Sequence, residues 1–254
     1  MTRSDGRLAA QLRRMAAEPA CLARADGSAR FSHGATEVLV AVYGPCEAKR
    51  TRERPDCSVL ECIVRPLAGL PGPVEREMEQ LLNQTLSHLV LVAQHPRTAI
   101  SVVVQVLADD GSLLATALHG ACLALAHAGV PLRGMLGSCT SVLLADGAIL
   151  LDPCVEEERD AQAVVTLAFQ LRQCADGTQD RQLLLSHMRG ALSAASKHDV
   201  LQHISAEAAG CATTFMRTTL TRQVQQLHEQ PERGARAGRV DDLIAEVKSR
   251  TAAA

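Results

Sequence analysis

The chain has 254 residues, a formal net charge of −2 and a hydrophobic content of 47%, so it can bury a sizeable core as one large domain or two small ones. It contains no tryptophan, one tyrosine and three phenylalanines, which argues against single-strand binding by stacking of bases on a sheet face. Because the net charge is slightly negative, any contact with nucleic acid has to come from a local basic patch or an assembled surface.

Nine cysteines are scattered singly along the chain, without a Cys-x-x-Cys pair or a zinc-finger spacing. The polar amino-terminal segment is not typical of a signal peptide, and no apolar run has the length of a membrane span. These features predict reduced, mostly buried thiols in an intracellular protein that has no membrane partner.

Asp-Gly dipeptides between β-prone residues predict tight turns at 26–27, 110–111, 146–147 and 176–177. The first turn is expected to join strands at residues 21–24 and 29–31. β-Branched residues predict the other strands, in chain order at residues 36–43, 58–65, 98–107, 140–144, 148–151, 164–171 and 181–185.

Three helices are predicted from apolar residues at helical spacing, at residues 74–92, 115–128 and 191 to about 228. The second is apolar almost all round and is therefore expected between two layers. The breaker-rich stretch 231–239 predicts a linker, so residues 1–229 would form the domain and residues 230–254 a flexible extension. Strands followed by helices, twice over, favour the α+β class, with mixed sheets packed on central helices.

The chain contains short blocks at residues 5–7, 25–29 and 34–45, followed by a longer patterned stretch at residues 103–169. In content and order these blocks resemble the RNase PH family, which comprises phosphate-dependent 3′–5′ exoribonucleases and their exosome-ring relatives. The resemblance implies one RNase PH-like βαβα domain of the ribosomal S5 domain 2-like type.

In family members that catalyse phosphorolysis, a Gly-Thr-Arg turn and a second arginine on the preceding helix hold the attacking phosphate. The resemblance places Gly111, Ser112 and Gln84 at these phosphate-binding positions, and Leu113 replaces the arginine of the turn. Phosphoryl transfer requires donors that neutralise the charge of the transition state. The resemblance therefore implies a degenerate phosphate site. A simple hairpin turn at Gly111-Ser112 is the structural alternative.

The resemblance also matches two carboxylates of the family, six residues apart, to Asp152 and Glu158, while a further family acid falls on Val164. Paired carboxylates are typical of general acid catalysis or of a divalent-metal site. Runs of acidic residues are usually solvated, however. Asp152 and Glu158 are accordingly predicted to be vestigial or weak catalytic residues, and no metal site is predicted.

Four cations, Lys49, Arg50, Arg52 and Arg54, occur within six residues directly after a predicted strand. A flexible basic loop of this kind is expected to contact RNA phosphates without reading the base sequence. The alternative is a solvated loop whose charges are balanced by Glu47 and Glu53.

The departures from the family pattern imply a non-phosphorolytic ring subunit of the eukaryotic RNA exosome, which scaffolds the core and helps thread RNA for 3′–5′ processing of rRNA, mRNA and other RNA. The implied partners are other RNase PH-like ring subunits, cap proteins and RNA, in the nucleus, nucleolus and cytoplasm, and no cofactor is expected. Two alternatives stay open. One is a homodimeric nuclease that acts on RNA or DNA through Asp152 and Glu158 with metal or phosphate. The other is a binding module that works without a ring.

Overall fold

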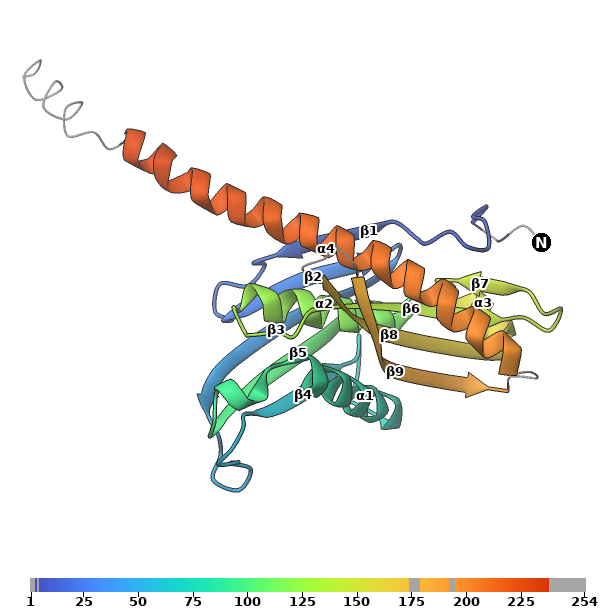
Figure 1. Cartoon of the computed structure of the whole chain (residues 1–254), viewed down its shortest axis with the longest axis horizontal. Coiled ribbons are helices and arrows are strands. Elements are labelled where there is room, and N and C mark those ends of the chain that lie inside the picture. The colour runs from blue at the N-terminus through green and yellow to red at the C-terminus, as the bar shows by residue number, and fades with distance from the viewer. Residues whose placement is uncertain (1–2, 4, 174–178, 192–194, 238–254) are drawn as a thin grey trace, which may run out of the picture. The chain divides into compact units, whose positions relative to one another are not determined.

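The computed structural model describes residue 3 and residues 5–173, 179–191 and 195–237. The chain divides into two compact units, Met1–Met216 and Arg217–Ala254. The first unit contains two sheets and the helices that pack on them (Figure 1). The candidate site belongs to the first unit.

The first sheet has five strands in the order β1-β2-β3-β5-β4. Their bounds are β1 (Met15–Pro19), β2 (Gly27–His33), β3 (Thr36–Glu47), β4 (Val59–Arg65) and β5 (Thr98–Ala108). Most neighbouring pairs are antiparallel, but β4 lies parallel to β5. A parallel pair needs a long crossover connection, and α1 (Pro73–Leu89) with the short 3₁₀ turn η1 (Val92–Gln94) supplies it.

The second sheet is entirely antiparallel, with the order β7-β6-β8-β9. It consists of β6 (Met135–Leu143), β7 (Ile149–Leu151), β8 (Ala163–Gln173) and β9 (Gln179–Gly190). The predicted hairpin turn at Asp146-Gly147 is confirmed: Gly147 has φ +86° and lies between β6 and β7. The turn predicted at 176–177 lies outside the described residues.

The helix α2 (Leu113–His127) lies between the two sheets, against β2 and β3 on one side and β6 on the other (Figure 1). Every side chain from Leu114 to Leu125 is buried, which confirms the prediction drawn from its all-round apolar surface. Gly120 permits the close approach to β3, because a Cβ there would lie 2.9 Å from the side chain of Val40.

Two further helices pack on the sheets. The helix α1 packs against β4 and buries Leu82, Leu86 and Leu89, and α4 (Ala195–Ala237) packs its early turns on β8 through Leu201 and Ala209. One mixed and one antiparallel sheet, both packed on helices, confirm the predicted α+β class. Within the described ranges, no helix has both the length and the apolar character required to cross a bilayer.

Two predicted elements are wrong. The first strand is β1 at Met15–Pro19 and not residues 21–24, which lie in the loop after it. The last residue pair between β1 and β2 is Pro19 with Ala29. The next residue, Ala20, has a positive φ of 64°, so the backbone leaves the extended conformation of the strand there. The stretch predicted as a linker is helical as far as Ala237.

Candidate functional site

The turn at residues 109–112 joins β5 to α2, so the hairpin interpretation of Gly111-Ser112 is wrong. Gly111 has φ +85° and Ser112 has φ +54°, and Ser112 is the N-cap residue of α2. The positive φ of Gly111 disfavours a side chain at this position. Packing also excludes one, because a Cβ there would lie 2.7 Å from the carbonyl oxygen of Pro153. The Ser112 hydroxyl donates to the same carbonyl at 3.1 Å. The turn is therefore held tightly against the segment that leads into α3 (Val155–Asp160).

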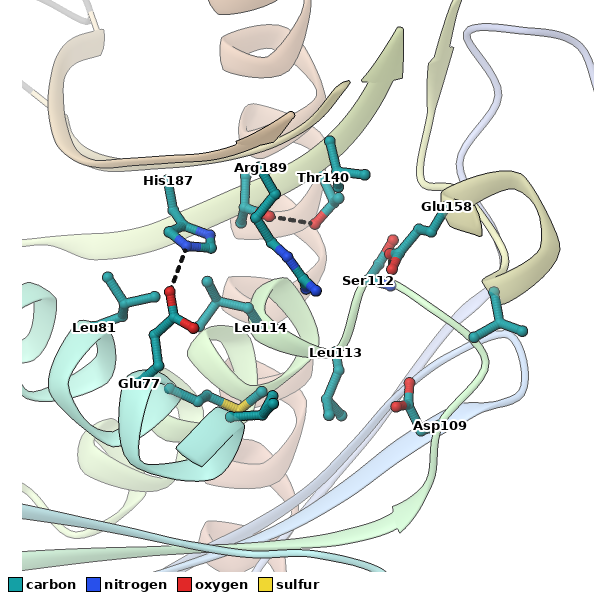
Figure 2. A pocket seen from close by; sticks show the side chains of 15 residues that line it. Glu77, Leu81, Asp109, Ser112, Leu113, Leu114, Thr140, Glu158, His187 and Arg189 are labelled. Carbon is teal, nitrogen blue, oxygen red and sulfur yellow. Dashed lines mark hydrogen bonds and ion pairs between the residues drawn. The ribbon is translucent and has the colours of Figure 1, made fainter. Parts of the chain in front are cut away.

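A cavity of about 150 Å³ opens in front of this turn (Figure 2). Its walls come from α1, the 109–112 turn, the start of α2, and from β6, α3, β8 and β9. Its polar lining consists of Glu77, Asp109, Ser112, Thr140, Glu158, Thr166, His187 and Arg189. The cavity thus combines the amino end of a buried helix with side chains of both charges.

Glu158 lies in this cavity, as its match to a family carboxylate implied. Its Oε1 accepts the backbone N–H of Ser112 at 2.6 Å, so the carboxylate sits at the positive end of the α2 dipole. Burial is the largest influence on this group and raises the pKa of Glu158 above its ordinary value, although the hydrogen bond from Ser112 opposes the shift.

The position of Glu158 is set by its neighbour on α3. Glu157 accepts the N–H of Cys154 at 3.0 Å, closing the first turn of α3. The same carboxylate is paired with Arg3 through hydrogen bonds of 2.8 and 2.6 Å. Arg3 also donates to the carbonyl oxygens of Leu151 and Asp152. The amino-terminal segment is therefore bound to the strand end that carries α3.

Asp152 has different surroundings from Glu158 and does not line the cavity. Its side chain is 3% exposed and pairs with Arg13, with 2.7 Å between Oδ1 and Nη2. The backbone N–H of Arg13 also donates to Oδ2 at 2.8 Å. Burial would raise the pKa of Asp152, but Arg13 and the nearby His33 outweigh it and lower the pKa to about 2. The structure thus uses Asp152 as a buried ionic partner, and the two carboxylates do not form a pair in one pocket.

Gln84 does not take part in the cavity either. Its side chain is exposed to solvent. The cavity is lined by residues from the preceding turns of α1: Val74, Glu77, Met78 and Leu81. The structure therefore does not support Gln84 as a phosphate ligand.

A cation that sequence reasoning missed, Arg189, projects from β9 into the cavity (Figure 2). It is paired in register with Val164 on β8, and His187 is paired with Thr166, so all four residues belong to the same face of the sheet. His187 forms a hydrogen-bond contact of 3.2 Å with Glu77. No charge run or spacing signals Arg189 in the sequence, because only the strand register places it opposite Glu158.

The predicted basic loop connects β3 to β4, and Lys49, Arg50, Arg52 and Arg54 are all exposed there. The Arg52 guanidinium lies 2.6 Å from a carboxylate oxygen of Glu61. The loop geometry is as predicted, while its contact with RNA stays a prediction.

Within the described part of the chain, no group of three or more His, Cys, Asp or Glu side chains is arranged to hold a metal ion. The cysteines that the structure describes are free thiols: Cys21, Cys46, Cys57, Cys62, Cys122, Cys139, Cys154 and Cys211. Burial raises the pKa of Cys122 to about 11 and that of Cys139 to about 12, so these two thiols stay protonated in the core.

Comparison with known proteins connects this geometry to a family. Residues 11–131 match the family model described as "3′ exoribonuclease family, domain 1", RNase PH. Over 231 residues the chain is 36% identical to the "Exosome complex exonuclease RRP46 homolog" of Oryza sativa subsp. japonica, a match that covers 87% of this chain and 97% of that protein. The chain belongs to the RNase PH family.

Two further similarities support this RNase PH membership. An Arabidopsis thaliana protein, also named "Exosome complex exonuclease RRP46 homolog", is 39% identical over 167 residues, covering 66% of this chain and 70% of that protein. The crystal structure of rice Rrp46 superimposes with a TM-score of 0.78 at 34% identity, covering 86% of this chain and all of that chain. The predicted RNase PH-like fold is thereby confirmed.

Proposed function

We propose that this RNase PH-like chain is a ring subunit of an RNA exosome core, which scaffolds the ring and helps thread RNA without catalysing phosphorolysis. Similarity along almost the whole length of the rice protein named as an exosome component supports the ring assignment. The observation that carries the non-phosphorolytic part is the amino end of α2, where the apolar Leu113 occupies the position of the family's turn arginine. A phosphate at this point would meet no cation from the turn.

The residues around this point support the same conclusion. Leu113, beside Ser112, contributes an apolar side chain to the cavity, and Gln84 lies outside it. Among the described residues that line the cavity, Arg189 is the one arginine. Two acidic side chains, Glu158 and Asp109, line the same cavity. Electrostatic stabilisation of a transferring phosphoryl group requires preorganised positive charge. This cavity offers little net positive charge for that purpose.

The homodimeric nuclease that acts through Asp152 and Glu158 is not favoured. Its two carboxylates would have to reach the same phosphodiester, yet Asp152 is paired with Arg13 and does not line the cavity. The similarity to proteins named as exosome components also gives this alternative no support.

Assembly tests the proposed function directly. When the tagged full-length chain is purified from its native cells, we expect five other RNase PH-like chains to co-purify in stoichiometric amounts, together with cap proteins and RNA. Solution mass then distinguishes a ring from a small assembly. Recovery of the chain only as a monomer or homodimer, with no other RNase PH-like chain, would contradict the proposal.

Phosphorolysis is expected to be absent from the purified chain. Each missing charge-assisted donor should cost about 10²–10³-fold in rate, the usual effect of removing one transition-state donor. The measurement is release of nucleoside diphosphates from a 3′-tailed RNA with and without inorganic phosphate, with an active RNase PH as positive control. Phosphate-dependent release at a rate comparable to that control would show that the chain is an enzyme.

The basic loop is proposed to bind RNA phosphates in the assembled ring. Changing Lys49, Arg50, Arg52 and Arg54 to Gln should weaken RNA binding about equally for all sequences and reduce the slope of log K against log salt, by ~0.7 for each lost phosphate contact. The matched control neutralises four exposed arginines elsewhere: Arg14, Arg24, Arg65 and Arg76. An unchanged slope in the loop variant would identify the loop as a solvated surface feature.

The finer aspects of the function are also proposals. We propose that the chain acts in the nucleus, nucleolus and cytoplasm, on rRNA, mRNA and other RNA, and without a cofactor of its own. These proposals follow from the exosome assignment. Imaging of the tagged protein and sequencing of RNA 3′ ends after its depletion would test them separately.

A further inference from the structure

A second cavity, of about 520 Å³, lies between the basic loop and β4, the edge strand of the first sheet. Its walls are residues 51–54 of the loop, residues 59–62 of β4, and Asn83 of α1. It is larger than the cavity of about 150 Å³ beside the 109–112 turn. Its volume falls within the range of about 300–1,000 Å³ that is typical of small-ligand sites. The cavity can therefore hold a ligand of the size of a single nucleotide.

Backbone hydrogen bonds hold the loop that forms one wall of this cavity. The carbonyl oxygen of Lys49 accepts the N–H of Arg52 at 2.8 Å, which closes a turn inside the loop. Arg97, directly before β5, accepts the N–H of Ala48 at 3.3 Å and donates its own N–H to the carbonyl oxygen of Arg54 at 3.1 Å. Both ends of the loop are thus fixed to the same residue, and the cavity has a defined wall.

The lining of the cavity offers a partner to each part of a nucleotide. Arg52 and Arg54 supply cations that suit a phosphate group. Glu61 is paired with Arg52 at 2.6 Å, which uses only part of the accepting capacity of its carboxylate, so it can also accept a ribose hydroxyl group. Val59 and Cys62 add apolar surface for the face of a base.

Asn83 contributes a neutral hydrogen-bonding group to the cavity from α1. Its Nδ2 donates to the carbonyl oxygen of Leu60 at 2.8 Å, which fixes the amide against β4. A side-chain amide has two N–H donors and one acceptor oxygen, so this bond leaves one donor for a ligand. The Ser87 hydroxyl lies 3.2 Å from Oδ1 but donates over 2.6 Å to the backbone carbonyl oxygen of Asn83, so Oδ1 keeps accepting capacity. Such an oriented amide suits the edge of a base.

We propose that this cavity binds one nucleotide of single-stranded RNA, with the phosphate at Arg52 and Arg54 and the base edge at Asn83. This inference rests on the proposed function and deepens it, because it gives the RNA that contacts the basic loop a defined binding site. It also separates two kinds of contact. The arginines bind by charge and are sensitive to salt, whereas Asn83 carries no charge and releases no counterion when it binds.

Photo-cross-linking locates the nucleotide. The full-length chain, in the assembly with which it co-purifies, is irradiated together with a single-stranded RNA that contains 4-thiouridine throughout. Mass spectrometry then identifies the cross-linked peptides. We expect cross-links in the peptides that contain residues 51–62 or Asn83. Cross-links that fall only on other peptides of this chain, or only on other chains, would overturn the proposal.

Two variants test the cavity by RNA affinity. Asn83→Ala should weaken RNA binding about two- to tenfold, the usual effect of losing one hydrogen bond. It should leave the slope of log K against log salt unchanged, because no charge is lost. Val59→Phe fills the cavity but keeps Asn83 and the loop cations, and it should weaken binding at least as much. Circular dichroism checks folding, and Val59→Phe keeps the test valid if Asn83→Ala does not fold.

Gln80→Ala is the matched control, because Gln80 is an exposed neutral residue of the same helix and lies outside the cavity lining. It should bind RNA as the wild type does. Unchanged affinity in both cavity variants, or an equal loss of affinity in Gln80→Ala, would overturn the proposal.

The outcome is separable from the tests of the proposed function. The variant that neutralises the four loop cations tests RNA binding by the loop itself. If that variant has a reduced salt slope while Asn83→Ala and Val59→Phe bind RNA as the wild type does, this inference alone is overturned. If the wild-type assembly binds no RNA, the proposed threading function is overturned together with it.

Discussion

Replacing Arg13 with methionine is expected to lower the free energy of unfolding by about 3–5 kcal/mol, the usual cost of leaving one partner of a buried ion pair without the other. Arg13 and Asp152 have side chains that are 6% and 3% exposed, and 2.7 Å separates their charged groups. Arg13 also donates to the carbonyl oxygens of Asp110 and Gly111, at 2.8 and 3.1 Å. The variant therefore leaves Asp152 charged and buried, and it releases the turn that precedes α2.

Urea unfolding measures this effect, with Arg14→Met as the matched control, because Arg14 is the exposed neighbour in the chain. The control should change the free energy of unfolding by under about 0.5 kcal/mol. Arg13→Met/Asp152→Asn should recover part of the loss, since it removes the uncompensated charge and keeps an acceptor for the backbone N–H of residue 13. A loss of under about 1 kcal/mol in Arg13→Met would mean that the pair contributes little to folding.

Elements that depend on a local pattern could be predicted from the sequence. The helix α2 is apolar all round, which indicates burial between two layers, and the turn at Asp146-Gly147 follows from the torsional freedom of glycine. The first strand was misplaced because nothing near residues 21–24 indicates that the pairing has already ended at Pro19. The hairpin alternative at Gly111-Ser112 is wrong, because positive-φ residues suit the junction between β5 and α2 as well as a hairpin.

The candidate site could be predicted only in part. Glu158, Gly111 and Ser112 lie together, as the resemblance implied. Arg13 was missed because its partner Asp152 is 139 residues away, and a lone arginine near the amino terminus carries no signal of burial. Arg189 was missed for a related reason, since its place opposite the helix end depends on the register of β8 with β9. Long-range pairing and strand register are properties of the folded chain.

Acid pH is expected to destabilise the protein through a buried histidine beside Asp152. His33 lies at the end of β2, and its ring centroid is 5.2 Å from that of His119 and 5.3 Å from that of Phe31. Neither of its ring nitrogens has a hydrogen-bond partner in the described structure. Burial lowers the pKa of His33 to about 4, the charge of Asp152 opposes the shift, and Arg13 adds to it.

The sign of the pH effect follows from proton uptake. Below pH 6.5 the unfolded chain binds a proton at His33, whereas the folded chain does not until about pH 4, so stability falls as pH falls through this window. At about 1.4 kcal/mol per pKa unit, the contribution of His33 is about 3 kcal/mol. His119, whose pKa is lowered first by burial and then by His33, acts in the same direction. Asp152 adds a further loss only below pH 3.8, as its folded pKa of about 2 is approached.

Unfolding of the wild type and of His33→Leu at several pH values between 4.5 and 7.5 tests this assignment. His33 makes no hydrogen bond that the leucine would lose, so the variant should fold and should show a shallower decline in stability toward acid pH, with a remaining slope that comes from His119. His88→Gln, at an exposed position on α1, is the control and should keep the wild-type slope. If His33→Leu declines as steeply as the wild type, the acid sensitivity originates elsewhere, and the buried cluster beside Asp152 does not set it.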